Sequence, residues 1–170
     1  MDIRLGAVQE ADVTMSATGH DHSGAADGST LGLDALRVDE QSAENAGAVT
    51  VLAGSTEVIA LPSMNVLAGD RILVNALFAG TKGVTAGDVS IAIQQLSGTA
   101  TIQSFNDKAY IDISEDIAAN KIMENHISGM FKVTVLGTLV LRLWAASAGS
   151  NVAVLAGDGQ IHALVLRGTG

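Results

Sequence analysis

The chain lacks cysteine altogether, has a single proline, and carries only one tryptophan, one tyrosine and three phenylalanines in 170 residues. Without cysteine it forms neither a disulfide nor a thiolate metal site. Basic residues are also scarce, because nine Lys and Arg stand against eighteen Asp and Glu, for a net charge of −9. Phosphate binding needs concentrated positive charge, so this balance argues against a nucleic-acid partner.

Long apolar runs are missing as well. No stretch of about 18 apolar residues is present, so we expect no membrane-spanning helix and no membrane partner. The first five residues lack the basic start and apolar core of a signal peptide, which argues against secretion by that route.

Aliphatic residues are what the chain has in abundance. Hydrophobic residues make up 48% of it, and the mean hydropathy is +0.36. This content is spread in short bursts of Val, Leu, Ile and Ala. A surplus of aliphatic surface without a membrane segment predicts an obligate oligomer in which some of it is buried between subunits.

From residue 49 onward, these bursts alternate with turns rich in Gly and Asp, which is typical of short strands. Phe131, Val133 and Val135 alternate with polar neighbours, so they mark one buried face. Residues 72–78 are apolar on both faces, which indicates packing against neighbouring subunits. We expect strands near 49–53, 56–61, 71–78, 89–96, 99–104, 130–135, 138–145, 151–155 and 160–167. The pattern predicts an all-β antiparallel jelly-roll β-sandwich.

Composition divides the chain in two. Residues 1–48 are rich in Gly, Ala, Ser and Asp and are too polar to pack a core. We therefore expect an extended N-terminal arm that docks the protein on its partner and forms the leader segment of the trimer. Residues 49–170 form the jelly-roll head domain. The segment 114–126 is either a short helix, with Ser114 as its N-cap, or an exposed loop, and the conformation of 105–129 is left open.

The most distinctive motif is Gly19-His20-Asp21-His22-Ser23-Gly24. Two residues apart on an extended chain point to the same side, so His20 and His22 can face one ion. Three chains would offer six imidazoles to a divalent transition metal on a trimer axis. The alternative is interchain packing, local hydrogen bonding or plain exposure without any metal.

An enzymatic interpretation is weaker. His20, His22 and Asp27 have the spacing of metal-binding cupins, which would hold Fe or Mn, and His162 is the one candidate for a fourth ligand. Cupin ligands, however, lie on strands inside the barrel. No serine-hydrolase elbow and no Walker loop is present, and His126 and His162 stand alone. We therefore expect no enzyme.

Two sets of apolar residues are candidates for contacts with other chains. The first alternates through residues 1–18 and is expected to dock on a partner as an extended arm: Ile3, Leu5, Val8, Val13 and Met15. The second is expected to pack between trimer copies: Leu31, Leu33, Leu36 and Trp144. Trp144 and Arg142 share a strand face, which anchors either a protein or a glycan or else packs in an interface. So few aromatics supply a carbohydrate surface poorly.

The leader resembles a motif of tailed-phage fibre and head-fibre proteins, matched by Gly19, His20, His22, Gly24, Gly28, Leu31 and Leu36. The C-terminal part is similar to the trimeric jelly-roll heads of phage fibres and decoration proteins, and to the trimeric sandwiches of the tumour-necrosis-factor and complement-C1q type. Its cues are residues 67–72, 131–143 and 164–168.

The resemblance implies a homotrimeric bacteriophage virion structural protein, assembled in the host cytoplasm and displayed on the virion surface. It would be a capsid decoration or head-fibre protein docked by its N-terminal arm on the major capsid or a tail protein. The alternatives are a short tail-fibre protein that binds a host surface receptor, a C1q-like binding module outside viruses, and the cupin-like metalloenzyme. Few aromatics favour decoration over receptor binding.

Overall fold

The computed structural model describes residues 38–54, 56–104 and 110–167, and these ranges contain strands and turns but no helix. Among them, therefore, no helix is long and apolar enough to cross a membrane. The strands are β1 (Val38–Glu44), β2 (Val49–Val51), β3 (Thr56–Ala60), β4 (Met64–Val66), β5 (Arg71–Lys82), β6 (Gly87–Gly98), β7 (Thr101–Ser104), β8 (Tyr110–Ile117), β9 (Ile122–Val135), β10 (Gly137–Ser147), β11 (Val152–Val154) and β12 (Gly159–Leu166).

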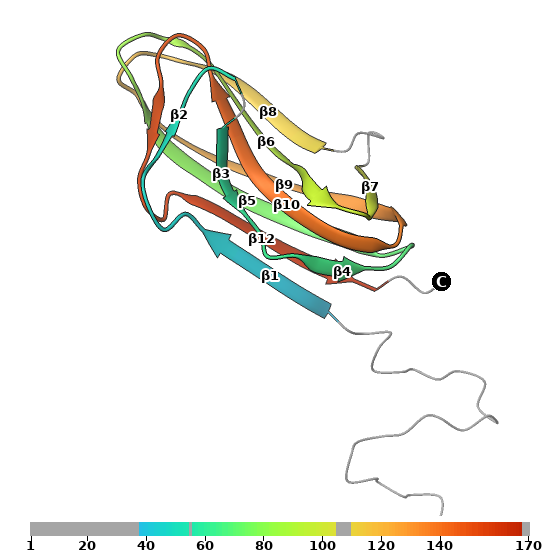
Figure 1. Ribbon diagram of the computed structural model, residues 1–170. Helices are drawn as coiled ribbons and strands as arrows, with labels where there is room; N and C mark the ends of the chain where they lie inside the picture. Colours follow the sequence, from blue (N-terminus) through green and yellow to red (C-terminus); the bar gives the residue numbers. More distant parts are fainter. Residues whose placement is uncertain (1–37, 55, 105–109, 168–170) are drawn as a thin grey trace, which may run out of the picture. The chain divides into compact units, whose positions relative to one another are not determined.

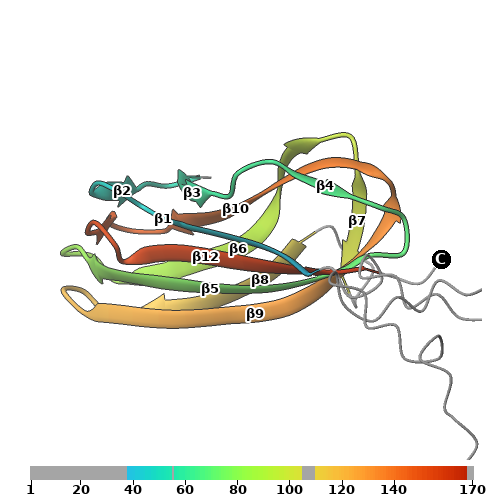
Figure 2. The same cartoon turned by 90° about the horizontal axis from the view of Figure 1, so that it is seen from below.

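The strands form two antiparallel sheets packed face to face (Figure 1, Figure 2). In the seven-stranded sheet, β12 lies between β1 and β5, β9 pairs with the other side of β5, and β7 pairs with β9. β11 pairs with the end of β5 and with β2. The five-stranded sheet has the order β3–β10–β6–β8, and β4 pairs with the start of β10.

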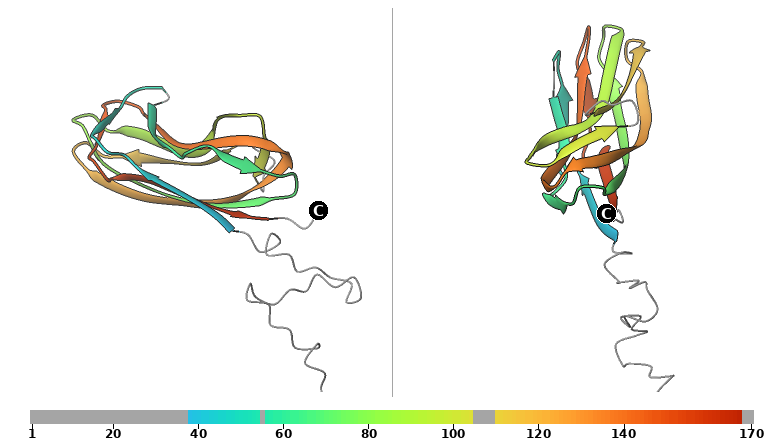
Figure 3. Two further views of the ribbon diagram at one scale, coloured as in Figure 1. Left: turned by 60° about the horizontal axis from the view of Figure 1, so that its bottom comes forward. Right: turned by 90° about the vertical axis from the view of Figure 1, so that its right-hand side faces the viewer.

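The chain passes between the two sheets at most of its connections. From β3 it crosses to β5, returns to β6, and after β8 alternates again through β9, β10 and β12 (Figure 3). This path is that of a jelly roll. The predicted all-β antiparallel jelly-roll sandwich is confirmed, because the short aliphatic bursts between Gly and Asp turns are indeed strands.

Alternation builds the core. Along β5 every second side chain is buried from Ile72 to Phe78, and along β10 every second side chain is buried from Leu139 to Ser147. Each strand therefore gives one face to the interior, and the opposite face points away from the sandwich.

The segment 114–126, expected as a helix or a loop, is neither. β8 runs to Ile117 and β9 starts at Ile122, with a short turn between them in which Asn120 has a φ of 58°. The acidic residues that suggested a helix N-terminus, Glu115 and Asp116, are exposed near the end of β8, while Ile111, Ile113 and Ile117 pack on the core. A period of two outweighs helix propensity here because one face of β8 is covered by the other sheet.

The sandwich also begins before the predicted boundary at residue 48. All seven residues of β1 pair with β12, from Val38 opposite Leu166 to Glu44 opposite Gln160. Contacts within the chain divide it into Met1–Leu36 and Arg37–Gly170. β1 has few aliphatic residues because it is an edge strand with an outward face, so its composition resembles that of the leader.

A buried asparagine holds β1 and β2 to the turn before β12. Asn45 is 3% exposed, and its Nδ2 donates to the carbonyls of Gly47 (2.8 Å) and Leu155 (2.7 Å). Its Oδ1 accepts from the backbone N–H of Gly159 at 2.7 Å. Every polar atom of this side chain that faces the interior therefore has a partner, as burial requires.

An arginine joins the opposite end. Arg167, just after β12, donates through Nη2 to Asp39 on β1 (2.6 Å) and through Nη1 to Asp70 before β5 (2.5 Å). Asp70 is 1% exposed, and it also accepts from the N–H of Leu67. The entry of the chain into β1 and its exit from β12 are thus tied together at one end of the sandwich.

Candidate functional site

Most of the site residues predicted from the sequence lie outside the residues that the structure describes. These are the metal candidates His20 and His22, the docking residues Ile3, Leu5, Val8, Val13 and Met15, and the packing residues Leu31, Leu33 and Leu36. Trp144 is the one member that the structure places. Within the described ranges, no group of three or more His, Cys, Asp or Glu side chains is arranged to hold a metal.

The two histidines that are described both point away from the core. His162 on β12 lies 2.9 Å from Glu40 on β1, measured from Nε2 to Oε1. His126 on β9 lies 3.2 Å from Glu124 on the same strand. His162 alternates with the buried Ile161 and Ala163, so its ring is on the outer face of the sheet rather than inside the sandwich, where a cupin ligand would lie.

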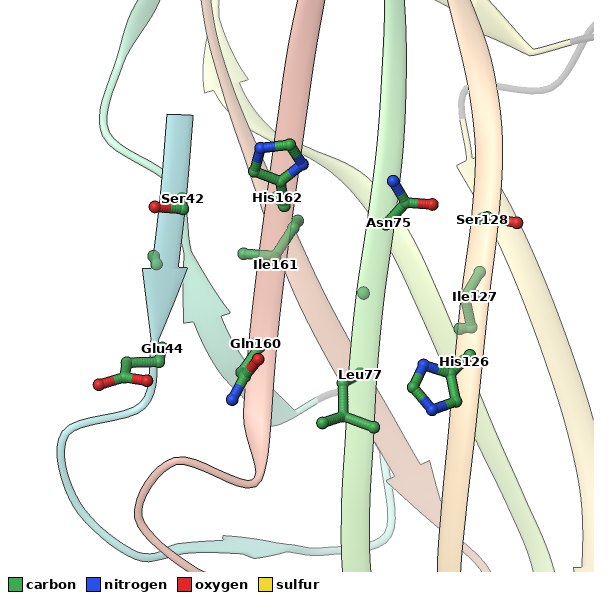
Figure 4. Close-up of a pocket in the computed structure, with 12 residues that line it drawn as sticks. Ser42, Glu44, Asn75, Leu77, His126, Ile127, Ser128, Gln160, Ile161 and His162 are labelled. Atoms are coloured by element: carbon green, nitrogen blue, oxygen red, sulfur yellow. The ribbon is translucent and has the colours of Figure 1, made fainter. Parts of the chain in front are cut away.

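Both histidines line a hollow on the outer face of the seven-stranded sheet. It has a volume of about 870 Å³ and extends across β1, β12, β5 and β9 (Figure 4). Residues that lie opposite one another on the four strands form rows across the hollow. One row is Ser42, His162, Asn75 and Ser128, and the next is Glu44, Gln160, Leu77 and His126.

Toward the end where Arg167 lies, the same face becomes aliphatic and then basic. The next row runs Glu40, Leu164, Leu73 and Met130, and the row after it ends with Leu166, Arg71 and Lys132. The outward charges of β1 are therefore acidic, whereas β9 carries His126 and Lys132 besides Glu124. We call this surface, defined by the four rows, the hollow face.

The outer face of the five-stranded sheet is different. Trp144 on β10 lies opposite Glu57 on one side and Ala92 on the other, and Arg142 lies opposite Gln94. Ala92 is fully covered although it faces outward. We call the surface formed by Trp144, Arg142, Gln94 and Tyr110 the tryptophan face.

The sequence placed Trp144 and Arg142 on one strand face correctly, but it missed the neighbours of that pair. Gln94 and Tyr110 come from β6 and β8, so only the strand register brings them there. The hollow was missed for the same reason, because its rows combine residues from four strands. The alternation of His162 with Ile161 was the one signal that pointed to it. The structure places Trp144 on the sheet opposite the hollow face, and a packing role for it stays a prediction.

No family model matches the chain, and no curated protein matches its sequence. Among solved structures, it is similar to a chain of infectious bursal disease virus, Gx strain, with 12% identity and a TM-score of 0.45 over 78% of its length. A mutant VP2 protein of the same virus, in T=1 particles, shows 13% identity and a TM-score of 0.34 over 78%. The Gt strain shows 18% and 0.31 over 79%.

The chain spans about a third of the length of these viral chains, namely 33%, 36% and 31%. All three are structures of infectious bursal disease virus or of T=1 particles of its VP2 protein, and none is a bacteriophage protein. The bacteriophage origin, the fibre or decoration role, the homotrimer and the surface location on the virion stay predictions.

Proposed function

We propose that the chain is a virion structural protein, a homotrimer that projects from a phage capsid as a decoration or head-fibre protein and is docked by its N-terminal arm. The proposal combines the His20 and His22 leader with a jelly-roll head. The observation that carries it is the hollow face, which has the features of a contact between copies of the chain.

A ring of identical subunits needs a surface whose two margins fit each other, because the left side of one copy meets the right side of the next. The hollow face has such margins. With the threefold axis along the strands, β1 of one copy meets β9 of its neighbour at the same height, together with β7 where β7 pairs with β9 beside Lys132. The aliphatic row of Leu73, Met130 and Leu164 then lies in the middle of the contact.

The polar groups on the two margins are complementary. Glu44 on β1 and His126 on β9 share one row, so a carboxylate and an imidazole, which can pair by a hydrogen bond, meet across such a contact. Glu40 on β1 lies one row from Lys132 on β9, a step of about 7 Å, which a lysine side chain spans. Complementary charges of this kind fix register and partner choice more than they add affinity.

The oligomer is tested by mass. Sedimentation or mass photometry is expected to give three times the 17.3 kDa of one chain, and a monomer at all concentrations would contradict the trimer. The face is tested by charge reversal. Glu40→Lys and Lys132→Glu should each shift the equilibrium toward monomer, and the double variant should restore the trimer.

The matched control is Asp88→Lys on β6 of the other sheet, which should leave the trimer intact. Trimers that tolerate both single reversals as well as the control would show that the copies meet elsewhere, while the trimer itself would stand.

Docking by the arm is tested separately. Deletion of residues 1–18, which removes Ile3, Leu5, Val8, Val13 and Met15, is expected to abolish attachment to particles without changing the thermal unfolding of the head. A truncated protein that still decorates particles would refute the arm.

The metalloenzyme alternative makes an opposite prediction for the leader histidines. In a fibre-type trimer, the double variant His20→Ala/His22→Ala should lower the trimer's melting temperature. In a cupin-like enzyme it should abolish bound metal and turnover and leave the oligomer unchanged. Metal analysis and sedimentation of the same sample separate the two.

A further inference from the structure

We propose that main-chain hydrogen bonds join neighbouring copies of the chain, from the free edge of β1 in one copy to the free edge of β9 in the next. The inference rests on the proposed trimer and says how its copies are linked. β1 pairs with β12 alone, and β9 pairs with β5 and, from Phe131 onward, with β7. The other side of β1 and that of residues 122–130 therefore have no strand partner in the described part of the chain.

The pairing within the sheet decides which main-chain groups point to the two edges. Residues of an antiparallel pair alternate between those that bond across the pair and those whose N–H and C=O point to the opposite side. The N–H of Asn45 donates to the carbonyl of Gly159, so Asn45 bonds across its pair. The N–H of Lys82 donates to the carbonyl of Lys121 in the same way. The alternate residues point outward, and these are Glu40, Ser42 and Glu44 on β1 and Glu124, His126, Ser128 and Met130 on β9.

The outward groups of the two edges meet when the strands stand at the same height. Three antiparallel pairings separate β1 from β9, so the two strands run in opposite directions, and a threefold axis along the strands keeps this true between copies. The opposed pairs are then Glu44 with His126, Ser42 with Ser128 and Glu40 with Met130. All six residues offer their N–H and C=O to the edge, so each pair forms the two-bond unit of an antiparallel ladder.

The side chains of these pairs suit each other as well. They all lie on the hollow face, because residues of one row share a face of the sheet. A carboxylate meets an imidazole in the pair of Glu44 with His126, and two hydroxyls meet in the pair of Ser42 with Ser128. Cross-strand pairs of these kinds stabilise a sheet. β7 covers β9 directly beyond Met130, so the free edge ends there.

Neither edge carries a device that blocks pairing. Lysine, proline and bulges protect exposed edges in natural sheets. β1 and residues 122–130 contain no lysine and no proline, and both pair with their own sheet without a register shift. The contact joins two different edges, so every copy gives one and receives one, and a closed ring of three leaves neither exposed.

Hydrogen exchange tests these bonds without altering the chain. The full-length trimer is isolated by sedimentation, and exchange at single amides is followed by mass spectrometry with fragmentation. The amides of Ser42 and Ser128 should exchange about tenfold or more slowly than unprotected amides do. The internal control is the amide of Ser114, at the edge of β8. The bond from Ala148 to Asp88 turns the even positions of β6 toward β10, so the amide of Ser114 points away from β6 and should not be slowed.

Proline at the same three serines removes only the outward N–H. Because that N–H makes no bond to the copy's own sheet, the ladder of the strand is kept. Ser42→Pro and Ser128→Pro should each weaken trimer assembly about tenfold or more, measured by sedimentation over a dilution series. Ser114→Pro is the matched control and should assemble as the parent does. Circular dichroism establishes that each variant is folded.

The outcomes separate the edge contact from the trimer itself. Slow exchange at Ser42 and Ser128, with weakened assembly in their proline variants alone, supports the contact. A trimer whose edge amides exchange as fast as that of Ser114 overturns the contact and leaves the trimer standing, and so do three proline variants that assemble alike. A monomer at every concentration overturns the proposed trimer and the edge contact together.

Discussion

At the scale of single residues, buried polar groups decide how the sandwich is closed. Asn45 uses both ends of its amide to join the end of β1 to the turn before β12, and its backbone pairs with Gly157 and Gly159. Each hydrogen bond of such a side chain adds little net free energy on folding, but a buried group that loses its partner costs much more. Asn45 therefore fixes the relative positions of the segments that it joins rather than adding buried apolar area.

Asn45→Asp should therefore destabilise the fold strongly. A carboxylate cannot donate, so the carbonyls of Gly47 and Leu155 would face an oxygen instead of an N–H. We expect the free energy of unfolding to fall by roughly 3 kcal/mol, measured by chemical denaturation. The exposed Asn151→Asp is the control and should change it by less than about 0.5 kcal/mol. Similar losses for both variants would mean that charge, not pairing, is responsible.

The backbone around Gly98 leaves no room for a side chain. It has a φ of +116°, and a Cβ there would lie 2.1 Å from the carbonyl oxygen of Thr138. We expect Gly98→Ala to lower the free energy of unfolding by about 2 kcal/mol or more. Gly47→Ala has open space within 4 Å, so it should be neutral or gain up to about 1 kcal/mol. A stable Gly98→Ala protein would show that the turn between β6 and β7 can move.

At the scale of elements, β1 shows where composition misleads. Its residues are mostly polar, yet all seven pair with β12, so the strand completes the sheet without supplying much of the core. The sequence assigned it to the arm because a solvated edge strand and the polar leader share the same residue types. Only the pairing partner distinguishes them.

Two truncations test this assignment. Removing residues 1–37 should leave the melting temperature of the sandwich nearly unchanged. Removing residues 1–48 deletes β1 and Asn45 and uncovers the edge of β12, so that protein should unfold several degrees lower and aggregate. Thermal unfolding and gel filtration of both proteins give the answer. Equal stability would make β1 dispensable and return the boundary to residue 48.

In the segment that joins β8 and β9, a strand was expected to be a helix or a loop. The acids after Ser114 favoured a helix start, but Ile111 and Ile113 alternate toward the core. Local propensity is a weak signal for a segment that packs on a sheet. Where alternation was clean, as in Phe131 and Val133 of β9 or in β10, the sequence predicted strands that the structure confirms.

At the scale of the whole molecule, Arg167 connects the two ends of the described chain. It pairs with Asp39 at the entry and with the buried Asp70 beside β5. Arg167→Met should lower the free energy of unfolding by roughly 3 kcal/mol, because the buried Asp70 would lose its guanidinium partner. Lys121→Met, in an exposed turn, is the control, expected to change it by less than about 0.5 kcal/mol. Urea unfolding of the two variants compares them, and equal midpoints would show that the ion pairs of Arg167 do not stabilise the sandwich.

The candidate sites show which features of a surface the sequence predicts and which it does not. Alternation was enough to place Trp144 beside Arg142 and to turn His162 outward. It could not assemble the rows of the hollow face, since these depend on which strands are neighbours and in what register. Nor could it reveal that Nε of Arg142 and Nε1 of Trp144 make no hydrogen bond to the residues that the structure describes, since this depends on everything that surrounds them.

The pairing of β1 with β12 has a mechanical consequence. Val38 and Arg167 lie at the same end of the sandwich, and β1 runs from there along the length of β12 (Figure 1). A pull on Val38 along the strand, resisted at the far end, loads all seven residue pairs at once, in shear. A pull that separates Val38 from Arg167 instead peels the pairs apart one after another. A tether through β1 thus resists tension along its axis far better than it resists being unzipped.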